Sequence, residues 1–167
     1  MRIASSEQVR VVPMPTPTDD HLAVWKQLQW ATALIHSRFR SDLAGSGMSI
    51  EELDVLVHLA WAPSGTLGLQ ELTASMVVAN ALSRSGITRL LDRMERDALV
   101  LRTVSKHDRR RFDVSLTPKG RRRYEQIWPE HVAGIARYFA EPLAEHDIGE
   151  LGKILADLIR ANEDQPR

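Results

Sequence analysis

The segment from Leu82 to Arg96 has the sequence LSRSGITRLLDRMER. Its apolar residues recur at near-helical spacing, at Ile87, Leu90, Leu91 and Met94. This period predicts an amphipathic helix over residues 83–97 with those four side chains on its inner face. The remaining positions of its first turns carry hydroxyls and arginines, namely Ser83, Arg84, Ser85, Thr88 and Arg89.

These residue types at the start of a helix suit contact with nucleic acid. A helix N-terminus presents free backbone N–H groups and the positive end of the dipole, and both attract phosphates. Serine and threonine reach phosphates or base edges, and arginine can donate two hydrogen bonds to guanine. The alternative is that Ser83 only caps the helix and the arginines are solvated.

A basic hairpin follows this helix. Phe112, Val114 and Leu116 alternate with polar residues, which is strand spacing, and residues 100–105 are the expected partner strand. The connection holds Lys106, Asp108, Arg109, Arg110 and Arg111. Consecutive arginines repel one another unless an anion is near, and projecting arginines suit a narrow minor groove. Asp108 is expected to hold one arginine in a bidentate pair; a solvated charged turn is the alternative.

The charge of the chain is concentrated around these two features. The chain is neutral overall, with 22 Lys+Arg and 22 Asp+Glu. Residues 84–123 contain thirteen Lys/Arg and five Asp/Glu, a net charge of +8, so the remaining residues have a net charge of −8. Part of the excess is Lys119 and residues 121–123, whose positive charge at a helix start opposes the dipole and indicates a compensating anion or a solvated face. A positive segment of this kind predicts a nucleic-acid partner.

The rest of the chain is predicted to be helical. Helices are expected from Asp19 to about residue 45, from Ser49 with a capping box to Glu52, over 69–77, from Thr117-Pro118 to about 140, and over 145–161. Residues 1–18 contain three alternating prolines and predict a flexible arm. The fold class is therefore mainly α with a small β-hairpin, in winged helix-turn-helix order.

Composition excludes several function classes. The chain has no cysteine, which excludes disulfides, thiolate metal sites and thiol redox sensing. No apolar run approaches about 18 residues and no secretory signal is present, so we expect no membrane segment and a cytoplasmic location. The histidines lack metal-ligand spacing and no catalytic constellation stands out, so no metal, cofactor or enzymatic activity is expected. The competing classes are an enzyme and a protein-interaction module with a basic lobe.

Four motifs in order resemble the MarR family of bacterial transcriptional regulators. They are the segment 82–96, Leu99-Val100, the run Asp108-Arg109-Arg110-Arg111, and residues 116–120, LTPKG. The resemblance covers about residues 20–160. It implies a MarR-type domain over 19–167, with a winged helix-turn-helix lobe at 49–117 and dimerisation helices at 19–45 and 118–162.

The resemblance also implies a partner and a mode of contact. The partner is a palindromic double-stranded DNA operator bound by an obligate homodimer. Ser83, Arg84, Ser85, Thr88 and Arg89 would lie in the major groove. Arg110 would enter the minor groove, with Asp108 orienting it.

The chain departs from the family pattern at two places. Ala98 stands where the family usually has glycine, so the exit from the recognition helix is expected to differ or to be slightly strained. The segment from Leu72 to Ser83 is about four residues longer than expected, with residues 78–81 as the surplus. The surplus adds a helical turn or widens the turn before the recognition helix.

Members of the family are often released from DNA by small aromatic or phenolic ligands. The residues that would border such a pocket here are Trp30, His36, His58, Trp61 and Trp128. The alternatives are that these residues form the core of a dimer, and that the regulator needs no ligand.

Overall fold

The computed structural model describes residues 16–80, 82–106 and 108–163, without the side chains of 78–80. The chain divides into two compact units, with the boundary between Leu34 and Ile35 inside the first helix. Most of the predicted N-terminal arm lies outside the described residues.

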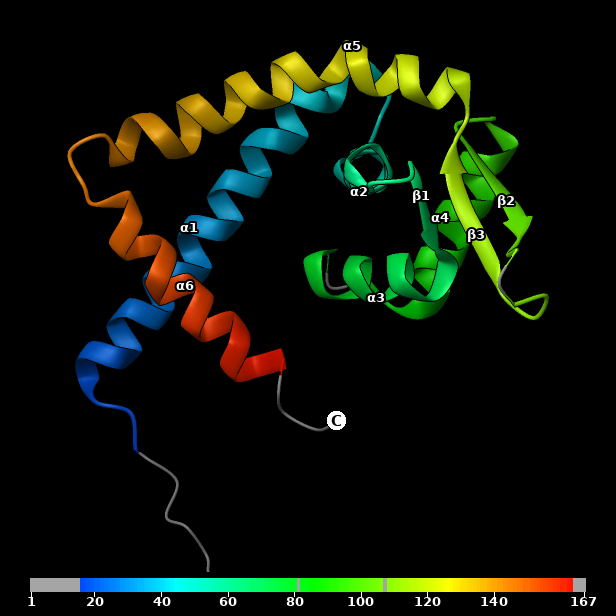
Figure 1. Cartoon of the computed structure of the whole chain (residues 1–167). Coiled ribbons are helices and arrows are strands. Elements are labelled where there is room, and N and C mark those ends of the chain that lie inside the picture. Colours follow the sequence, from blue (N-terminus) through cyan, green and yellow to red (C-terminus); the bar gives the residue numbers. More distant parts are fainter. Residues whose placement is uncertain (1–15, 81, 107, 164–167) are drawn as a thin grey trace, which may run out of the picture. The chain divides into compact units, whose positions relative to one another are not determined.

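Figure 1 shows the helices and strands in chain order. They are α1 (Asp19–Leu43), η1 (Ala44–Ser46), α2 (Ile50–Trp61), β1 (Thr66–Gly68), α3 (Leu69–Asn80), α4 (Arg84–Arg96), β2 (Val100–Val104), β3 (Phe112–Leu116), α5 (Pro118–Ile135), the π-helical η2 (Ala136–Ala140), η3 (Glu141–Leu143) and α6 (Ile148–Glu163). Among the described residues, no helix has both the length and the apolar character needed to cross a membrane.

The start of α2 is fixed by the predicted capping box. The hydroxyl of Ser49 accepts the backbone N–H of Glu52 at 3.2 Å, and the Glu52 carboxylate accepts the N–H of Ser49 at 3.0 Å. Both bonds satisfy N–H groups that have no partner within the helix. Gly47, with φ of +69°, turns the chain into this cap.

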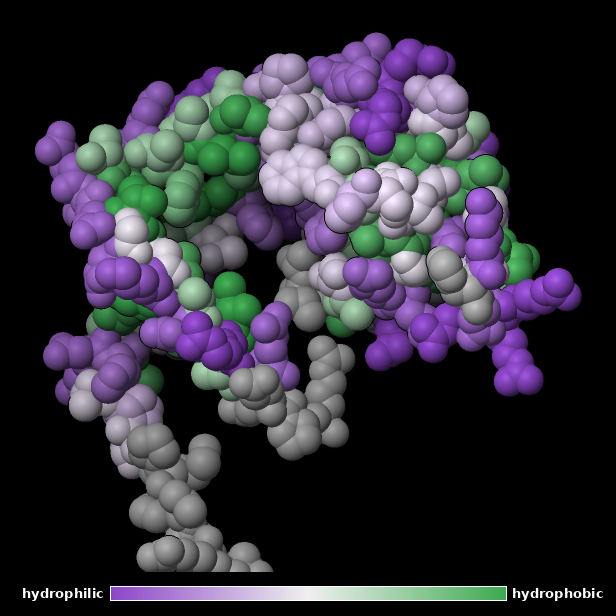
Figure 2. Space-filling model, viewed as in Figure 1, coloured by the Kyte–Doolittle hydropathy of each residue, from purple (hydrophilic) through white to green (hydrophobic). Residues whose placement is uncertain are grey.

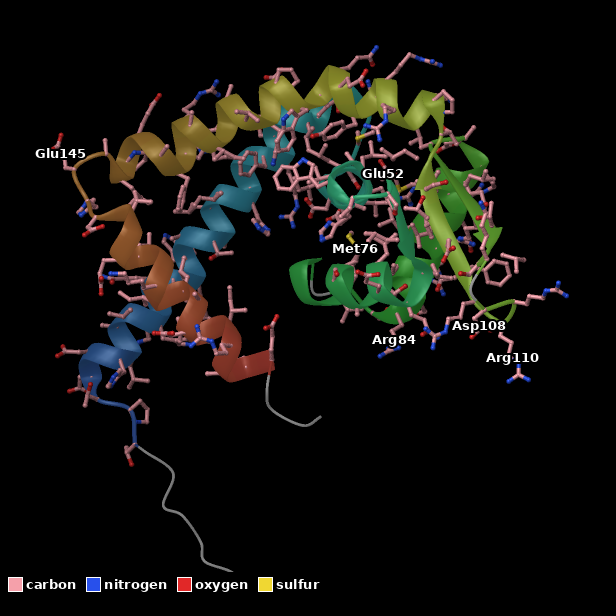
Figure 3. The ribbon with its side chains drawn as sticks, in the orientation of Figure 1. Glu52, Met76, Arg84, Asp108, Arg110 and Glu145 are labelled. Atoms are coloured by element: carbon pink, nitrogen blue, oxygen red, sulfur yellow. The ribbon has the colours of Figure 1, made fainter. Side chains whose placement is uncertain are left out.

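A single apolar core joins α2, α3, α4 and the sheet into one lobe. Its fully buried side chains are Leu53, Val55, Leu56, Leu59, Leu72, Met76, Ile87, Leu91, Met94, Val100 and Val114. Each buried side chain of this size contributes about 1.5–3 kcal/mol relative to an exposed one. Met76 lies inside the lobe in Figure 3. The inner face predicted for α4 is confirmed, since Ile87, Leu90, Leu91 and Met94 are all buried.

The predicted hairpin is confirmed, but it belongs to a sheet of three strands. The order is β1-β3-β2, and all pairs are antiparallel. β1 pairs Thr66 with Ser115 and Gly68 with Asp113. β1 was not predicted, because three residues are too few to show an alternating pattern.

The helix before the turn is longer than predicted. α3 runs to Asn80 and not to residue 77, so it includes three of the four surplus residues 78–81. Ala81 lies outside the described residues. The surplus therefore extends α3 before Ser83 caps α4.

The exit from α4 is strained at Ala98. Ala98 has φ of +55°, the left-handed conformation that favours glycine. Its N–H donates to the carbonyl of Glu95 at 2.9 Å, and the N–H of Leu99 donates to that of Met94 at 2.8 Å. This pair of bonds is a Schellman motif with alanine in the glycine position. The left-handed conformation costs an alanine about 1–2 kcal/mol.

The C-terminal helices differ from the prediction in detail. Thr117 caps α5 and Pro118 is its first residue, as predicted. The α-helical hydrogen bonding ends at Ile135, and π-helical and 3-10 turns follow before the chain reaches α6. α6 begins at Ile148 and not at residue 145, because the side chain of Asp147 accepts the N–H of Glu150 at 3.0 Å and so fixes its start.

Gly120 allows the start of α5 to pack directly against the end of α4. A Cβ atom at Gly120 would lie 2.0 Å from the carbonyl oxygen of Leu99, which is backbone and cannot rotate away. We expect Gly120→Ala to lower the free energy of unfolding by about 3 kcal/mol or more, as overpacking and strain at a core position do. Thermal unfolding measures this loss.

Gly45→Ala is the matched control, because a Cβ at Gly45 has no neighbour within 4 Å. It should change the free energy of unfolding by less than about 1 kcal/mol. Equal stability of the two variants would contradict the close approach.

Candidate nucleic-acid interface

The predicted contact residues of α4 are all on its solvent face. Ser83, Arg84, Ser85, Thr88 and Arg89 are exposed, while the opposite face of the helix is buried. The N-terminal turn of α4 thus presents a polar and positive surface.

Ser83 is the N-cap of α4. Its hydroxyl oxygen accepts the N–H of Gly86 at 3.1 Å and lies 3.0 Å from the hydroxyl of Ser85. Ser83 therefore caps the helix, as one of the two interpretations of the sequence predicted. A cap leaves the other free N–H groups of the first turn available to an anion.

Two of the arginines of α4 have no acidic partner among the described residues, whereas Arg93 pairs with Glu52 at 2.9 Å. Within the described parts of the chain, no ion pair includes Arg84 or Arg89. The side chains of Arg84 and Arg110 project from the same side of the lobe (Figure 3). Two elements that are separate in sequence therefore direct their cations the same way.

The wing connects β2 to β3 through a tight turn. The N–H of Arg111 donates to the carbonyl of Asp108 at 2.9 Å, and the N–H of Ser105 donates to the carbonyl of Arg111 at 2.9 Å. Lys106, Arg109 and Arg110 are exposed around this turn. Figure 2 shows hydrophilic side chains gathered where the wing extends from the lobe.

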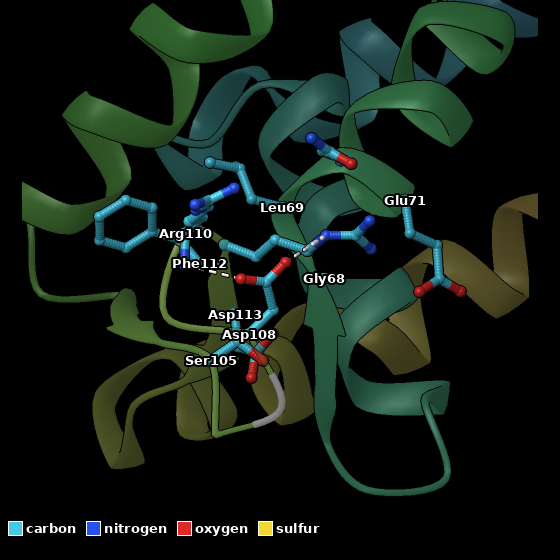
Figure 4. A pocket seen from close by; sticks show the side chains of 10 residues that line it. Gly68, Leu69, Glu71, Ser105, Asp108, Arg110, Phe112 and Asp113 are labelled. Carbon is cyan, nitrogen blue, oxygen red and sulfur yellow. Dashed lines mark hydrogen bonds and ion pairs between the residues drawn. The ribbon is translucent and has the colours of Figure 1, made fainter.

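Asp108 pairs with one arginine of the wing, as expected, but through a single contact to Arg111 and not a bidentate one. The family resemblance implied that Asp108 orients Arg110, and its contact with Arg110 is to the backbone. Its Oδ2 lies 3.3 Å from Nε of Arg111, and its Oδ1 accepts the backbone N–H of Arg110 at 2.9 Å (Figure 4). The guanidinium of Arg110 is exposed, and no ion pair within the described residues includes it.

Arg102 ties the wing to the recognition helix, and the sequence analysis did not single it out. From β2, its NH1 contacts Asp92 at 2.6 Å and Glu95 at 3.6 Å, and its NH2 donates to the carbonyl of Thr88 at 3.4 Å. Its backbone N–H also donates to Glu95 at 3.0 Å. The side chain of Arg102 is 20% exposed, while that of Asp92 is 49% exposed. The network fixes α4 relative to β2.

Two of the four basic residues at the start of α5, which are Lys119 and residues 121–123, bond backbone carbonyls. Nζ of Lys119 donates to the carbonyl of Asp97 at 2.8 Å, and a guanidinium N–H of Arg123 donates to the carbonyl of Ser46. Both carbonyls lie at helix ends, where cations are favoured. Arg121 and Arg122 are exposed.

Two of the predicted ligand residues are in contact with each other. The rings of Trp61 and Trp128 meet edge to face, with centroids 5.3 Å apart. Nε1 of Trp61 donates to the hydroxyl of Tyr124 at 3.1 Å, and Tyr124 stacks on Trp128 at 5.4 Å. Trp61 is nevertheless 65% exposed, so one side of this cluster is open.

The other predicted ligand residues are more scattered. His58 is half-buried with Nδ1 2.8 Å from the carbonyl of Asp54, and it lines a shallow depression next to Trp61. His36 is half-buried on α1. Trp30 belongs to the first unit, where it is 69% exposed.

The sequence analysis missed the residues that extend the aromatic cluster along α5. His131 lies 5.6 Å from Trp128 and 4.6 Å from Phe39, and Phe39 meets Tyr138 edge to face at 5.6 Å. Gly134 makes room for this packing, since a Cβ there would lie 2.7 Å from the Phe39 ring. Spacing of 124, 128 and 131 on one helix face is the signal that could have found them.

The surroundings of His131 favour its neutral form. Burial lowers the pKa of His131 below its ordinary value of 6.5, and the nearby charge of Asp54 opposes this only in part. Its Nδ1 is buried without a hydrogen-bond partner in the described structure. Protonation therefore has to place a charge between two aromatic rings.

This environment predicts a loss of stability in mild acid. Because the folded pKa of His131 is lower than the unfolded one, the unfolded chain binds the proton first as the pH falls. Stability should decrease from above pH 6.5 down to the folded pKa, and His131→Gln should make that decrease shallower. Thermal unfolding between pH 8 and pH 5 measures both.

His146→Gln, at an exposed histidine, is the control and should leave the decrease as it is. Identical pH profiles for the parent and His131→Gln would contradict the effect of burial.

Comparison with known proteins identifies the architecture. A scan of the chain against family models gives no match. The HTH-type transcriptional repressor MdtR of Bacillus subtilis is 32% identical over 129 residues, which are 77% of this chain and 79% of that protein. AbsC, a MarR family transcriptional regulator from Streptomyces coelicolor, superposes with a TM-score of 0.78 at 26% identity, covering 91% of this chain and 100% of AbsC.

A second solved structure is similar over the same range. NadR in complex with 4-hydroxyphenylacetate has a TM-score of 0.66 and 27% identity, covering 92% of this chain and 100% of NadR. The likeness includes the helix-turn-helix, the wing and the flanking helices of the chain. The protein belongs to the MarR family of DNA-binding transcriptional regulators.

Proposed function

We propose that this regulator is a homodimeric repressor that binds a palindromic duplex and is released by a small aromatic ligand. One observation carries the DNA-binding geometry. The unpaired arginines of α4 and of the wing project from the same side of one lobe (Figure 3). A surface with this charge fits the phosphates on either side of a groove.

The recognition helix and the wing have separate roles in this proposal. Arg84, Ser85, Thr88 and Arg89 are exposed on a helix that fits the major groove. Ser83 caps that helix at the phosphate backbone. Arg110 reaches the adjacent minor groove, where a guanidinium is favoured by the negative potential, while Lys106, Arg109 and Arg111 contact phosphates.

Exposed apolar side chains on the C-terminal helices support a dimer. α5, η2 and α6 expose Val132, Ile135, Phe139, Ile148, Ile154, Leu158 and Ile159. In the first unit, α1 exposes further apolar residues, namely Leu22, Val24, Trp25, Leu28, Trp30 and Leu34. Surfaces this apolar are usually covered by a partner, and a second copy of the chain provides a matching one. Two lobes related by a two-fold axis fit a palindromic site.

The repressor role and the aromatic ligand are supported by similarity and by the cluster on α5. The relative MdtR is a repressor by name, and NadR binds 4-hydroxyphenylacetate. Trp61, Trp128 and Tyr124 offer aromatic surfaces and a hydroxyl with one open side. An aromatic acid or phenol fits such a surface better than an aliphatic ligand does.

The proposal predicts a steep dependence of DNA affinity on salt. With roughly 8–10 phosphate contacts per dimer, the slope of log K against log salt concentration should be about −7 to −9. Arg110→Ala should weaken binding most for operators with AT-rich flanks, because those flanks have the narrowest minor groove. Fluorescence anisotropy with a duplex selected from random-sequence DNA measures both.

Arg160→Ala is the control, since Arg160 is a cation on α6 whose acidic partner is Asp157. It should leave both the slope and the flank preference unchanged. A parent slope near −2, or normal binding of every duplex by Arg110→Ala, would rule out the proposed geometry.

The proposal also predicts release by an aromatic acid. Saturating 4-hydroxyphenylacetate or a related phenolic acid should lower operator affinity by about 5- to 150-fold, the usual range of coupling between two sites. Trp128→Leu should lose this response while it keeps its operator affinity, because Trp128 lies in the cluster and not on the DNA-facing surface. Acetate at the same concentration is the control. If a panel of phenolic acids neither changes affinity nor perturbs tryptophan fluorescence, the regulator is ligand-independent.

A further inference from the structure

Two large apolar side chains are exposed in the basic wing. Val104 is 54% exposed and Phe112 is 47% exposed, and the two residues are paired directly across β2 and β3. Their neighbours in the chain toward the turn are basic, including Lys106 and Arg110. An exposed apolar pair within a charged surface usually marks a contact site.

The strand register shows which way this pair faces. Antiparallel partners share a face, and alternate residues of a strand share it too. Val104 and Phe112 therefore lie on the same face as Arg102 and Val114, the pair two positions along the strands. Val114 is fully buried, and Arg102 contacts α4, so this face is the one that packs on the helices.

The pair is located between the recognition helix and the tip of the wing. Arg102 reaches the carbonyl of Thr88 on α4. Val104 is two residues, or about 7 Å, farther along β2, and Phe112 is two residues from Arg110. Phe112 also lines a depression of about 350 Å³ with Leu69 and Arg110 (Figure 4). The inner face thus continues past the core as an apolar surface. The depression beside it is lined by Arg110 and Arg111 and also by the carboxylates of Glu71, Asp108 and Asp113.

We infer that Val104 and Phe112 form an apolar contact with the deoxyribose faces of the DNA strand that separates the two grooves. The inference rests on the proposed function. If α4 lies in the major groove and the wing in the adjacent minor groove, one sugar-phosphate strand passes between them. Arg84 in the major groove and Arg110 in the minor groove lie on its two sides, and the C–H edges of its sugars cover the apolar pair.

A matched control residue exists on the same strand. The exposed fraction of Leu101, 48%, is similar to that of Phe112. Leu101 pairs with Ser115 and lies on the other face of the sheet. A DNA strand between α4 and the wing tip does not touch that face. Leu101→Ala removes a similar apolar surface without removing the proposed contact.

The test compares Phe112→Ala, Val104→Ala and Leu101→Ala in the full chain with the selected duplex. Phe112→Ala should bind about tenfold more weakly and Val104→Ala about threefold, since less apolar area is buried in each complex. Leu101→Ala should bind like the parent. The salt slope should stay unchanged in all three variants, because an apolar contact releases no counterions.

Other results would overturn the inference. If Phe112→Ala binds the duplex as tightly as the parent or as Leu101→Ala does, the proposed contact with the sugars is ruled out. A salt slope that becomes less steep by 2 or more, together with a lower melting temperature, shows that Phe112 only supports the hairpin and its arginines. A Phe112→Ala variant that becomes smaller in sedimentation shows that the pair binds protein. A parent that binds no duplex overturns the proposed function itself.

Discussion

The lobe depends on one junction, where the first turn of α5 is bonded to the residues that follow α4. The hydroxyl of Thr117 donates to the carbonyl of Ala98 at 2.6 Å and accepts the N–H of Gly120 at 3.0 Å. The N–H of Thr117 donates to the carbonyl of Leu99 at 3.1 Å, and Lys119 bonds that of Asp97. These bonds use backbone groups at the start of α5 and just beyond the end of α4 that have no partner within those helices. They also close the base of the hairpin, so the position of the wing follows from the same contacts.

The junction uses part of the positive charge of residues 84–123. Its +8 charge is not one surface, because Lys119 and Arg123 bond carbonyls at helix ends. Within the described residues, Arg84, Arg89 and Arg110 have no ion-pair partner. α5 begins at the end of β3 opposite the wing tip. Charge counted along a sequence therefore overestimates the charge available to a partner. What matters is which cations have no acceptor within the fold.

Features that are set by neighbouring residues could be predicted from the sequence, and features that are set by distant contacts could not. The capping box at Ser49 and the cap at Thr117 are contained in four residues, so the sequence alone predicts them. β1 is defined by its pairing with residues 113–115, which no local pattern encodes. The site follows the same division. The exposed face of α4 follows from its period, while the contacts of Arg102 and His131 depend on tertiary packing.

α5 links the two halves of the proposed mechanism. Its first turn holds the carbonyl of Leu99 against Gly120, and the next turns carry Trp128 and His131 in the aromatic cluster. α5 therefore both contacts the residues that follow α4 and carries part of the aromatic cluster. The space at Gly120 is so small that any shift of α5 has to move Leu99, and Arg102 ties the following strand to α4. In the proposed mechanism, a ligand that displaces Trp128 would therefore move α4 and the wing together, because close-packed elements transmit displacement rather than absorb it.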